Sequence, residues 1–426
     1  MPTTISSARL TTDIAVIGGG AAGASAAAVL AQTGLGVVLI EREARFRDRV
    51  RGESIHPWGV RQIEALGLSD VLQAAGANEL PLWAGYSGQS SVGGGRYDSL
   101  GPDVPNELAI YHPAMQAALL EHASSCGVRV LRPARVTNFT RAPWPQLLVA
   151  TATVTYDVRA RLVIGADGRH SAARRWTGAK TLHAPTHHQV GGCLLDGVSL
   201  ADDTFHTAGL QGGFVLVFPQ GCGRARTYIV GNDSVAMPLR RPGHVSDYIA
   251  CCASVFPEGA FDAARPAGPL AFFSNADIWS DRLYHDRVVL IGDAAGANDP
   301  SGGHGLSLSF RDVRELRDQL RNEPDWDMAM RGYAAERMAY YAVLRVLVQW
   351  LGILTTEVGP EADARRSLVA QAKEIDPSRG GFARMDVSGP DGLVADEAAR
   401  RHYFGEDLAD TIAPTTINTT PTNAAP

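Results

Sequence analysis

The sequence predicts an α/β fold in which a Rossmann-like parallel sheet is interrupted by an inserted antiparallel β-sheet. Three observations support this prediction. Residues 13–40 have the pattern of strand, helix and strand, which is a βαβ unit. Residues 182–273 contain short apolar runs separated by Gly-, Pro- and Asp-rich turns, a pattern typical of antiparallel sheets. Residues 288–320 return to a buried strand and a helix, so the first fold resumes after the insertion.

The elements of the parallel fold follow from hydrophobic periodicity. Helices are expected at 21–33, 57–66, 113–125 and 305–320, strands at 13–18, 36–40, 128–131, 136–139 and 288–291, and a hairpin at 146–158. The clearest strands of the insertion are 213–219 and 227–230. The apolar stretch 340–354 is interrupted by Arg345 and Gln349. We expect it to be a packed amphipathic helix and not a transmembrane segment, which needs roughly 20 apolar residues.

The composition is typical of a globular protein of two or three domains, with 426 residues of which 45% are hydrophobic. The net charge is −6, from 39 basic and 45 acidic residues, which argues against nucleic acid or an anionic membrane as a partner. The five cysteines include no C-x-x-C pair, so we expect neither a disulfide framework nor a metal site. With no secretory pattern at the N-terminus, a cytoplasmic location is expected.

The first motif that carries chemistry is the run Gly18-Gly19-Gly20-Ala21-Ala22-Gly23 between a predicted strand and a predicted helix. Its first glycine permits a tight turn, its second lets the backbone approach a pyrophosphate, and its third lets helix and strand pack closely. The helix N-terminus offers free N–H groups to the phosphates. Glu41 ends the next strand, where its carboxylate can accept hydrogen bonds from ribose hydroxyls. Together these features predict a dinucleotide site.

Two further motifs follow buried strands. Residues 163–168 end in Asp167-Gly168, and residues 288–295 contain Gly292-Asp293. The second is followed by the glycine-rich segment 300–305 and by a helix that carries Asp312. Either motif alone could be a strand with a polar turn, but the three motifs in this order are much more specific.

On these three motifs, residues 12–345 resemble the class A flavoprotein monooxygenases, the aromatic-hydroxylase superfamily, which is related to flavin halogenases and geranylgeranyl reductases. The resemblance implies a Rossmann-like FAD-binding domain of the glutathione-reductase type. It implies that Asp293 bonds the ribityl chain and that the segment from Pro300 to Leu306 lies beside the isoalloxazine ring. A helix N-terminus there stabilises negative charge on the reduced flavin.

Less specific matches to the family add further residues to the expected cofactor site. In the family, an arginine loop near the pyrophosphate matches Arg51, a flavin-contacting glutamine matches Gln116, Arg42 flanks the adenosine, and the Val136 backbone meets the adenine. The residues expected to hold FAD are Gly18, Gly20, Ala21, Ala22, Gly23, Glu41, Arg42, Arg51, Gln116, Val136, Asp167, Asp293, Pro300, Gly303, Gly305 and Leu306.

The resemblance implies an FAD-dependent monooxygenase of secondary metabolism that uses NAD(P)H and O₂. Oxygen would add at C4a of the reduced flavin, and the hydroperoxide would hydroxylate or epoxidise an electron-rich aromatic or conjugated small molecule. NAD(P)H could bind transiently, or a separate flavin reductase could supply reduced flavin. The aromatic side chains Phe214 and Phe218 of the insertion are expected to contact the substrate. His56 and His304 are candidate bases by position, but a structural role is favoured for both, so no catalytic residue is assigned.

Departures from the family pattern leave three alternatives open. Gly52-Glu53-Ser54 followed by Pro57 resembles the halogenase and prenyl-reductase branches. A halogenase needs a lysine early in the chain, whereas the only lysines are Lys180 and Lys373. The apolar stretch 213–219 ends in Phe218-Pro219, which somewhat favours a reductase of the geranylgeranyl-reductase type. A flavin-binding protein without catalytic activity is the third alternative.

The predicted domain organisation combines discontinuous segments. The FAD-binding domain comprises 10–76, 108–180 and 280–345, and the substrate-binding β-sheet domain comprises 77–107 and 181–279. Residues 346–410 are expected to form a C-terminal helical segment. The Thr-, Asn- and Pro-rich stretch 411–426 is expected to be a disordered tail.

Overall fold

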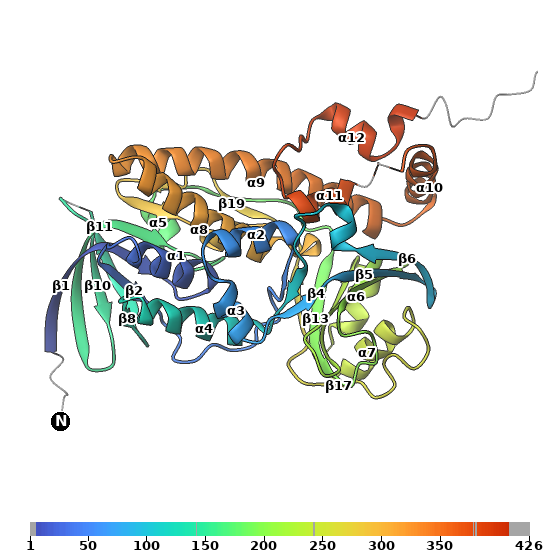
Figure 1. Cartoon of the computed structure of the whole chain (residues 1–426), viewed down its shortest axis with the longest axis horizontal. Coiled ribbons are helices and arrows are strands. Elements are labelled where there is room, and N and C mark those ends of the chain that lie inside the picture. The colour runs from blue at the N-terminus through green and yellow to red at the C-terminus, as the bar shows by residue number, and fades with distance from the viewer. Residues whose placement is uncertain (1–5, 142, 242, 378, 380, 409–426) are drawn as a thin grey trace, which may run out of the picture.

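The predicted parallel sheet is present in the computed structural model, which describes residues 6–141, 143–241, 243–377, 379 and 381–408. The expected tail at 411–426 lies outside these residues. Five strands run parallel in the order β21-β11-β1-β2-β8, and four of them, β11, β1, β2 and β8, are labelled in Figure 1. They are β1 (Ser6–Ile17), β2 (Val37–Ile40), β8 (Arg129–Leu131), β11 (Val154–Gly165) and β21 (Val288–Leu290). Strand β1 begins earlier than predicted because β11 pairs with it from Ser6 onward.

Successive side chains of β1 point to opposite faces of this sheet, and both faces are covered by apolar layers. Ile14 and Val16 join a core beneath three helices, whereas Ala15 and Ile17 join a second core on the opposite face. A helical layer on one face and a small antiparallel layer on the other define the predicted type of FAD-binding fold. The helical layer contains α1 (Ala21–Ala31), α4 (His112–Ser125) and α8 (Gly305–Asn322), and the other layer contains β9 (Arg135–Thr140) and β10 (Gln146–Ala150).

The insertion forms a second sheet with the order β17-β13-β16-β15-β14-β5-β6 and with β18 also paired to β13. All neighbours are antiparallel except β14 and β5, so the predicted antiparallel sheet is confirmed with one exception. Its strands are β5 (Leu82–Ser87), β6 (Ser90–Arg96), β13 (Gln189–Asp196), β14 (Thr204–Leu210), β15 (Gly213–Pro219), β16 (Arg224–Gly231), β17 (Arg265–Pro266) and β18 (Ala271–Ser274).

The insertion also contains two helices that were not predicted, α6 (Asp233–Leu239) and α7 (Val245–Ala253). They contribute Leu239 and Tyr248 to an apolar core shared with Val215 and Val217 of β15. These helices are only 7 and 9 residues long, too short to be stable alone, and the apolar face of the sheet gives them a surface on which to pack. The opposite face of β15, with Leu216 and Phe218, is therefore turned toward the FAD-binding sheet.

The C-terminal part is helical, but its first helix differs from the prediction. Helix α9 (Trp326–Thr356) is continuous for 31 residues and runs across the predicted boundary at 345. Its length and composition would allow it to cross a membrane, and 33% of its most apolar window is buried in the protein. One such helix is weak evidence for a membrane span, because a core helix can have the same composition. Helices α10 (Pro360–Ile375), α11 (Gly381–Ser388) and α12 (Glu397–Tyr403) follow at the same end of the molecule as the second sheet, where α11 packs on α2 and α10 on α9 (Figure 1).

Short elements complete the fold. Strand β12, at the start of the predicted insertion, pairs with β19 in a separate small sheet and not with the large antiparallel sheet. The remaining elements are α2 (Pro57–Ala65), α3 (Ser69–Ala74), α5 (Ala173–Trp176), β3 (Ser54–Ile55), β4 (Asn78–Leu80), β7 (Glu107–Ala109), β12 (Thr181–His183), β19 (Ile278–Ser280), β20 (Tyr284–His285), β22 (Gly296–Ala297), η1 (Tyr97–Leu100), η2 (Gly292–Ala294), η3 (Pro300–Gly302) and η4 (Glu406–Leu408).

Candidate functional site

Two adjoining cavities lie at the carboxyl ends of the parallel strands. The inner cavity, of about 280 Å³, lies between this edge and the antiparallel sheet, and the outer cavity, of about 440 Å³, extends along β2 and β9. Six residues line both cavities, so the two form one continuous site. These shared residues are Gly20, Arg51, His112, Gln116, Ala166 and Gly168.

The structure brings together nearly all of the predicted cofactor residues around this site. The outer cavity is lined by Gly18, Glu41, Arg42, Val136 and Asp167. The inner cavity is lined by Ala21, Ala22, Asp293, Pro300, Gly303, Gly305 and Leu306. Gly20, Arg51 and Gln116 line both, and only Gly23 among the predicted residues lines neither.

The glycine motif shows why side chains are excluded from this turn. Gly18 has φ = +103°, and a Cβ atom there would lie 2.4 Å from the Ala166 carbonyl oxygen. A Cβ on Gly23 would lie 2.0 Å from the Gly18 carbonyl oxygen, so Gly23 serves the packing of helix on strand. A Cβ on Gly20 would meet only Gln116, at 3.5 Å, and would otherwise fill the space where the two cavities join.

Backbone N–H groups of the protein hold the Glu41 carboxylate in place without a ligand. Its Oε2 accepts a hydrogen bond of 2.6 Å from the Gly19 N–H, and its Oε1 accepts one of 2.6 Å from the Glu43 N–H. The side chain is buried at the wall of the outer cavity. A fixed carboxylate in this position is suited to bind ribose hydroxyls.

The two aspartates of the later motifs have different roles. The Asp167 carboxylate accepts hydrogen bonds from the Ser171 hydroxyl and from the N–H groups of Ala172 and Ala173, so it fixes the start of α5. The Asp293 carboxylate has no hydrogen-bond donor among the residues that the structure describes, and it lines the inner cavity. Burial raises the pKa of Asp293, while nearby arginines, of which Arg51 is the strongest, oppose this rise.

Two residues of this site were not assigned from the sequence, and one of them, Arg174, positions the Asp293 backbone. Arg174, which is buried, donates hydrogen bonds to the carbonyl oxygens of Asp293, at 3.0 Å, and of Ala294, at 2.9 Å. His112 lines both cavities and bonds the Gly52 carbonyl through Nδ1 at 2.7 Å. Arg174 stands seven residues after Asp167 in the chain, and only the fold brings it to Asp293.

The segment from Pro300 to Leu306 presents backbone to the inner cavity. The Asp299 carboxylate accepts a hydrogen bond of 2.9 Å from the Ser301 N–H, and Gly303 has φ = +69°. Helix α8 then begins at Gly305, so its free N–H groups lie at this wall. An anionic or electron-rich group beside this wall is stabilised by the helix N-terminus.

The wall opposite this segment is apolar and comes from the antiparallel sheet. Phe218 is part of it and stacks on Phe205 at a centroid distance of 4.9 Å. Phe214, the other predicted substrate residue, packs in the same apolar cluster but does not line the cavity. The other wall residues from this sheet are Val190, Leu216, Tyr228, Val230 and Phe273.

A buried ion pair behind this wall joins the antiparallel sheet to the loop that carries Arg51. Arg226 of β16 pairs with Glu53, and its Nη2 is 2.7 Å from the Asp48 carboxylate. The Tyr228 hydroxyl donates a hydrogen bond of 3.1 Å to Glu53. Burial raises the pKa of Glu53 to about 7, although Arg226 opposes the rise. The pair fixes the loop that carries Arg51 against the antiparallel sheet.

The two candidate bases lie outside both cavities. His56 is buried, with Nε2 at 2.8 Å from the Gly302 carbonyl oxygen. Burial opposes its charge, but Asp386 and Glu107 raise the pKa of His56 to about 10. His304 is completely buried at the start of α8, where burial lowers its pKa. The structure thus places neither histidine where it could contact a substrate.

These observations define a dinucleotide-binding flavoprotein, because the residues fit FAD along its whole length. Gly20 leaves an open cradle suited to a pyrophosphate, and Glu41 is fixed as a ribose-binding carboxylate would be. The half-buried carboxylate of Asp293, which has no hydrogen-bond donor among the described residues, would suit the ribityl chain. The sequence matches the family model described as FAD binding domain over residues 11–337, so the chain belongs to this family.

Known relatives agree with this assignment. The chain is 27% identical to digeranylgeranylglycerophospholipid reductase 1 of Methanococcoides burtonii, over 69% of this chain and 71% of that protein. It is 25% identical to the rifampicin monooxygenase of Rhodococcus hoagii, over 85% of this chain and 75% of that protein. The crystal structure of pqsL, a probable FAD-dependent monooxygenase from Pseudomonas aeruginosa, matches with a TM-score of 0.70 at 21% identity, over 82% of this chain and 97% of that chain. The protein is an enzyme of the FAD-dependent monooxygenase superfamily.

The flavin is expected to be FAD and to be bound noncovalently. The outer cavity with Glu41 accommodates an adenosine half, which FMN lacks, and the resemblance specifies no attachment residue. Acid precipitation of the purified protein should release the flavin into the supernatant, where chromatography should identify FAD. Recovery of FMN, or of a flavin that remains with the pellet, would contradict this expectation.

Proposed function

We propose that this enzyme hydroxylates or epoxidises an electron-rich aromatic or conjugated small molecule, with NAD(P)H as the reductant and O₂ as the co-substrate. The observation that carries this proposal is the inner cavity itself. Its two opposing walls are the backbone segment at Pro300–Leu306 and the apolar face of the antiparallel sheet with Phe218. A planar apolar molecule fits between such walls beside a flavin.

The contributions of the chain follow from this arrangement. FAD, when bound, supplies the redox and oxygen-activating chemistry. The N–H groups at the start of α8 stabilise negative charge at the flavin ring, and the apolar wall excludes water from the reacting atoms. Leu216 and Phe218 would hold the substrate plane against the cofactor.

The test is product analysis with aromatic and polyene candidates under ¹⁸O₂. The expected product gains one oxygen atom from O₂, and NADH or NADPH is consumed only when FAD is present. Parallel reactions with an added flavin reductase distinguish direct reduction by NAD(P)H from reduction by a partner. Absence of oxygen incorporation in both arms, with a substrate that binds and perturbs the flavin spectrum, would refute the proposal.

A reductase is the second candidate, since one of the relatives reported above is a reductase of an isoprenoid lipid. The same product analysis separates the two, because a reductase product gains hydrogen and no oxygen and needs no O₂. A halogenase is less favoured, because no lysine is among the residues that line the two described cavities.

Phe218 is expected to control the fit of the substrate. Phe218→Leu should keep FAD but alter the substrate range, or release more hydrogen peroxide per NAD(P)H oxidised, because the shortened side chain opens the wall beside the substrate. Phe214→Leu is a matched control on the same strand and face, outside the cavity wall. If the Phe218 variant behaves like the Phe214 variant while both retain FAD, the substrate does not contact this wall.

A further inference from the structure

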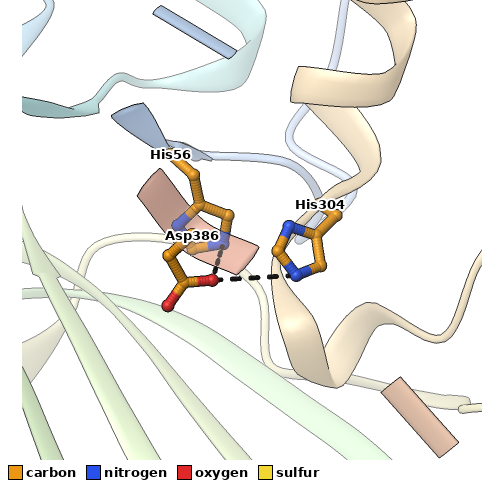
Figure 2. Close-up of side chains that lie close together, drawn as sticks. All are labelled: His56, His304 and Asp386. Carbon is orange, nitrogen blue, oxygen red and sulfur yellow. Dashed lines mark ion pairs between the residues drawn. The ribbon is translucent and has the colours of Figure 1, made fainter. Parts of the chain in front are cut away.

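Three polar side chains from distant parts of the chain converge beneath the segment that lines the inner cavity. His56 precedes α2, His304 precedes α8, and Asp386 lies on α11 (Figure 2). Oδ1 of Asp386 is 3.7 Å from Nε2 of His56 and 3.7 Å from Nε2 of His304. One donor atom from each residue lies within 4.8 Å of the other two.

These separations are too long for direct hydrogen bonds, which are about 2.7–3.2 Å. Oδ1 of Asp386 is buried and has no hydrogen-bond donor among the described residues. Donor atoms that share a transition-metal ion at about 2.0–2.2 Å are separated from one another by roughly 3–4 Å. The two distances from Asp386 thus match the separation expected between ligands of one ion.

The surroundings of His56 also match those of a metal ligand. Its other ring nitrogen, Nδ1, is 3.4 Å from Oε1 of Glu107. Glu107 is itself fixed by hydrogen bonds from the Ser54 hydroxyl and from the Tyr97 hydroxyl, the latter at 2.5 Å. A carboxylate behind the second nitrogen orients metal-binding histidines in many proteins. The Gly302 carbonyl, 2.8 Å from Nε2 of His56, is an additional oxygen close to the same point.

We propose that His56, His304 and Asp386 bind one divalent first-row transition ion, such as Zn²⁺ or Fe²⁺. Two imidazole nitrogens and one carboxylate oxygen favour these ions over Mg²⁺ and Ca²⁺, which prefer oxygen ligands. Imidazoles coordinate as neutral rings, so the ion replaces protons in balancing the charges of Asp386 and Glu107. The ion ties α11 to the segment at Gly302–His304 that borders the FAD site.

Trp58 provides an internal reporter of this event. Its Nε1–H lies 3.3 Å from Nδ1 of His304 and donates a hydrogen bond to it. When Nε2 of His304 coordinates an ion, Nδ1 carries the ring proton and can no longer accept this hydrogen bond. Ion binding therefore changes the surroundings of the Trp58 indole, and Trp58→Phe removes the corresponding change in fluorescence.

The experiment uses the full-length, tag-free protein with FAD bound. The protein is treated with a chelator, incubated with excess Zn²⁺, Fe²⁺ (anaerobically) or Co²⁺, desalted, and analysed for metal by mass spectrometry. About one ion per chain is expected in the wild type, and at least tenfold less in Asp386→Asn and in His304→Asn. Bound Co²⁺ should also give absorption at wavelengths beyond the flavin bands, and the ion should raise the melting temperature.

His285→Ala is the matched control, because His285 pairs with Asp286 at 3.3 Å on the surface and should not affect the ion content. Wild-type protein that retains less than one ion per ten chains with every metal refutes the site, whatever the variants do. Equal retention by wild type and by a folded, FAD-containing Asp386→Asn variant also refutes it. These readouts do not depend on substrate turnover, so failure of the proposed reaction would leave this test intact.

Discussion

Asp293→Ala is expected to lower the affinity for FAD by roughly 10- to 100-fold, whereas Asp167→Ala is expected to leave it nearly unchanged. A charge-assisted hydrogen bond to a buried ligand typically contributes about 1.5–3 kcal/mol, which corresponds to this range. The Asp293 carboxylate has no hydrogen-bond donor among the described residues and lines the inner cavity, so its partner is expected to be the cofactor.

Asp167 is a demanding control because it has the same side chain and lies in the same site. Its carboxylate is engaged by Ser171, Ala172 and Ala173 at the start of α5. Its loss should therefore lower stability by about 0.5–2 kcal/mol, as loss of a helix cap does. Titration of apoprotein with FAD, followed by flavin fluorescence, measures both affinities. Equal dissociation constants for the two variants would show that Asp293 does not bond the flavin.

Asp312→Ala is expected to lower the free energy of unfolding by about 3–5 kcal/mol, the cost of leaving a buried charge without its partner. Asp312 of α8 is fully buried, and its Oδ1 is 2.7 Å from Nε of Arg337 on α9, which is 1% exposed. The same carboxylate accepts hydrogen bonds from the Gly292 N–H, at 2.7 Å, and from the Tyr340 hydroxyl, at 2.5 Å. The variant should also bind FAD more weakly. Loss of the hydrogen bond to the Gly292 N–H loosens the turn that positions Asp293, the next residue.

A surface ion pair on α9, the helix that carries Arg337, is the control for the buried pair. Arg331 and Asp327 of α9 are 2.8 Å apart, and both are more than half exposed. Arg331→Ala should leave the free energy of unfolding nearly unchanged, because exposed ion pairs contribute little. Urea unfolding at a fixed excess of FAD, followed by tryptophan fluorescence, compares the two variants. If Asp312→Ala lowers the free energy of unfolding by less than about 1 kcal/mol, the ion pair of Asp312 with Arg337 does not stabilise the contact between α8 and α9.

The local sequence determined the FAD-binding half of this protein. Gly18, Gly23 and Glu41 could be recognised because a tight turn, a close helix–strand contact and a ribose-binding carboxylate each impose a residue type at a fixed spacing. In β15, Phe214, Leu216 and Phe218 stand at alternate positions, which puts them on one face of a strand, and the structure places Leu216 and Phe218 of that face at the cavity. Such features depend on neighbours in the chain, which is why a sequence can reveal them.

Only the tertiary structure decided which residues meet across the fold. Asp167 and Asp293 both follow buried strands, so they have the same pattern in the sequence. In the structure, Asp167 fixes the start of α5, whereas Asp293 lines the inner cavity, where the cofactor is expected. The tertiary structure brought Arg174 to the Asp293 backbone and Asp386 to His56 and His304. It also showed that Phe214 and Phe218, four residues apart on one face of β15, differ in their access to the cavity. Contacts of this kind join segments far apart in the chain and leave no periodic pattern, because packing and not spacing selects them.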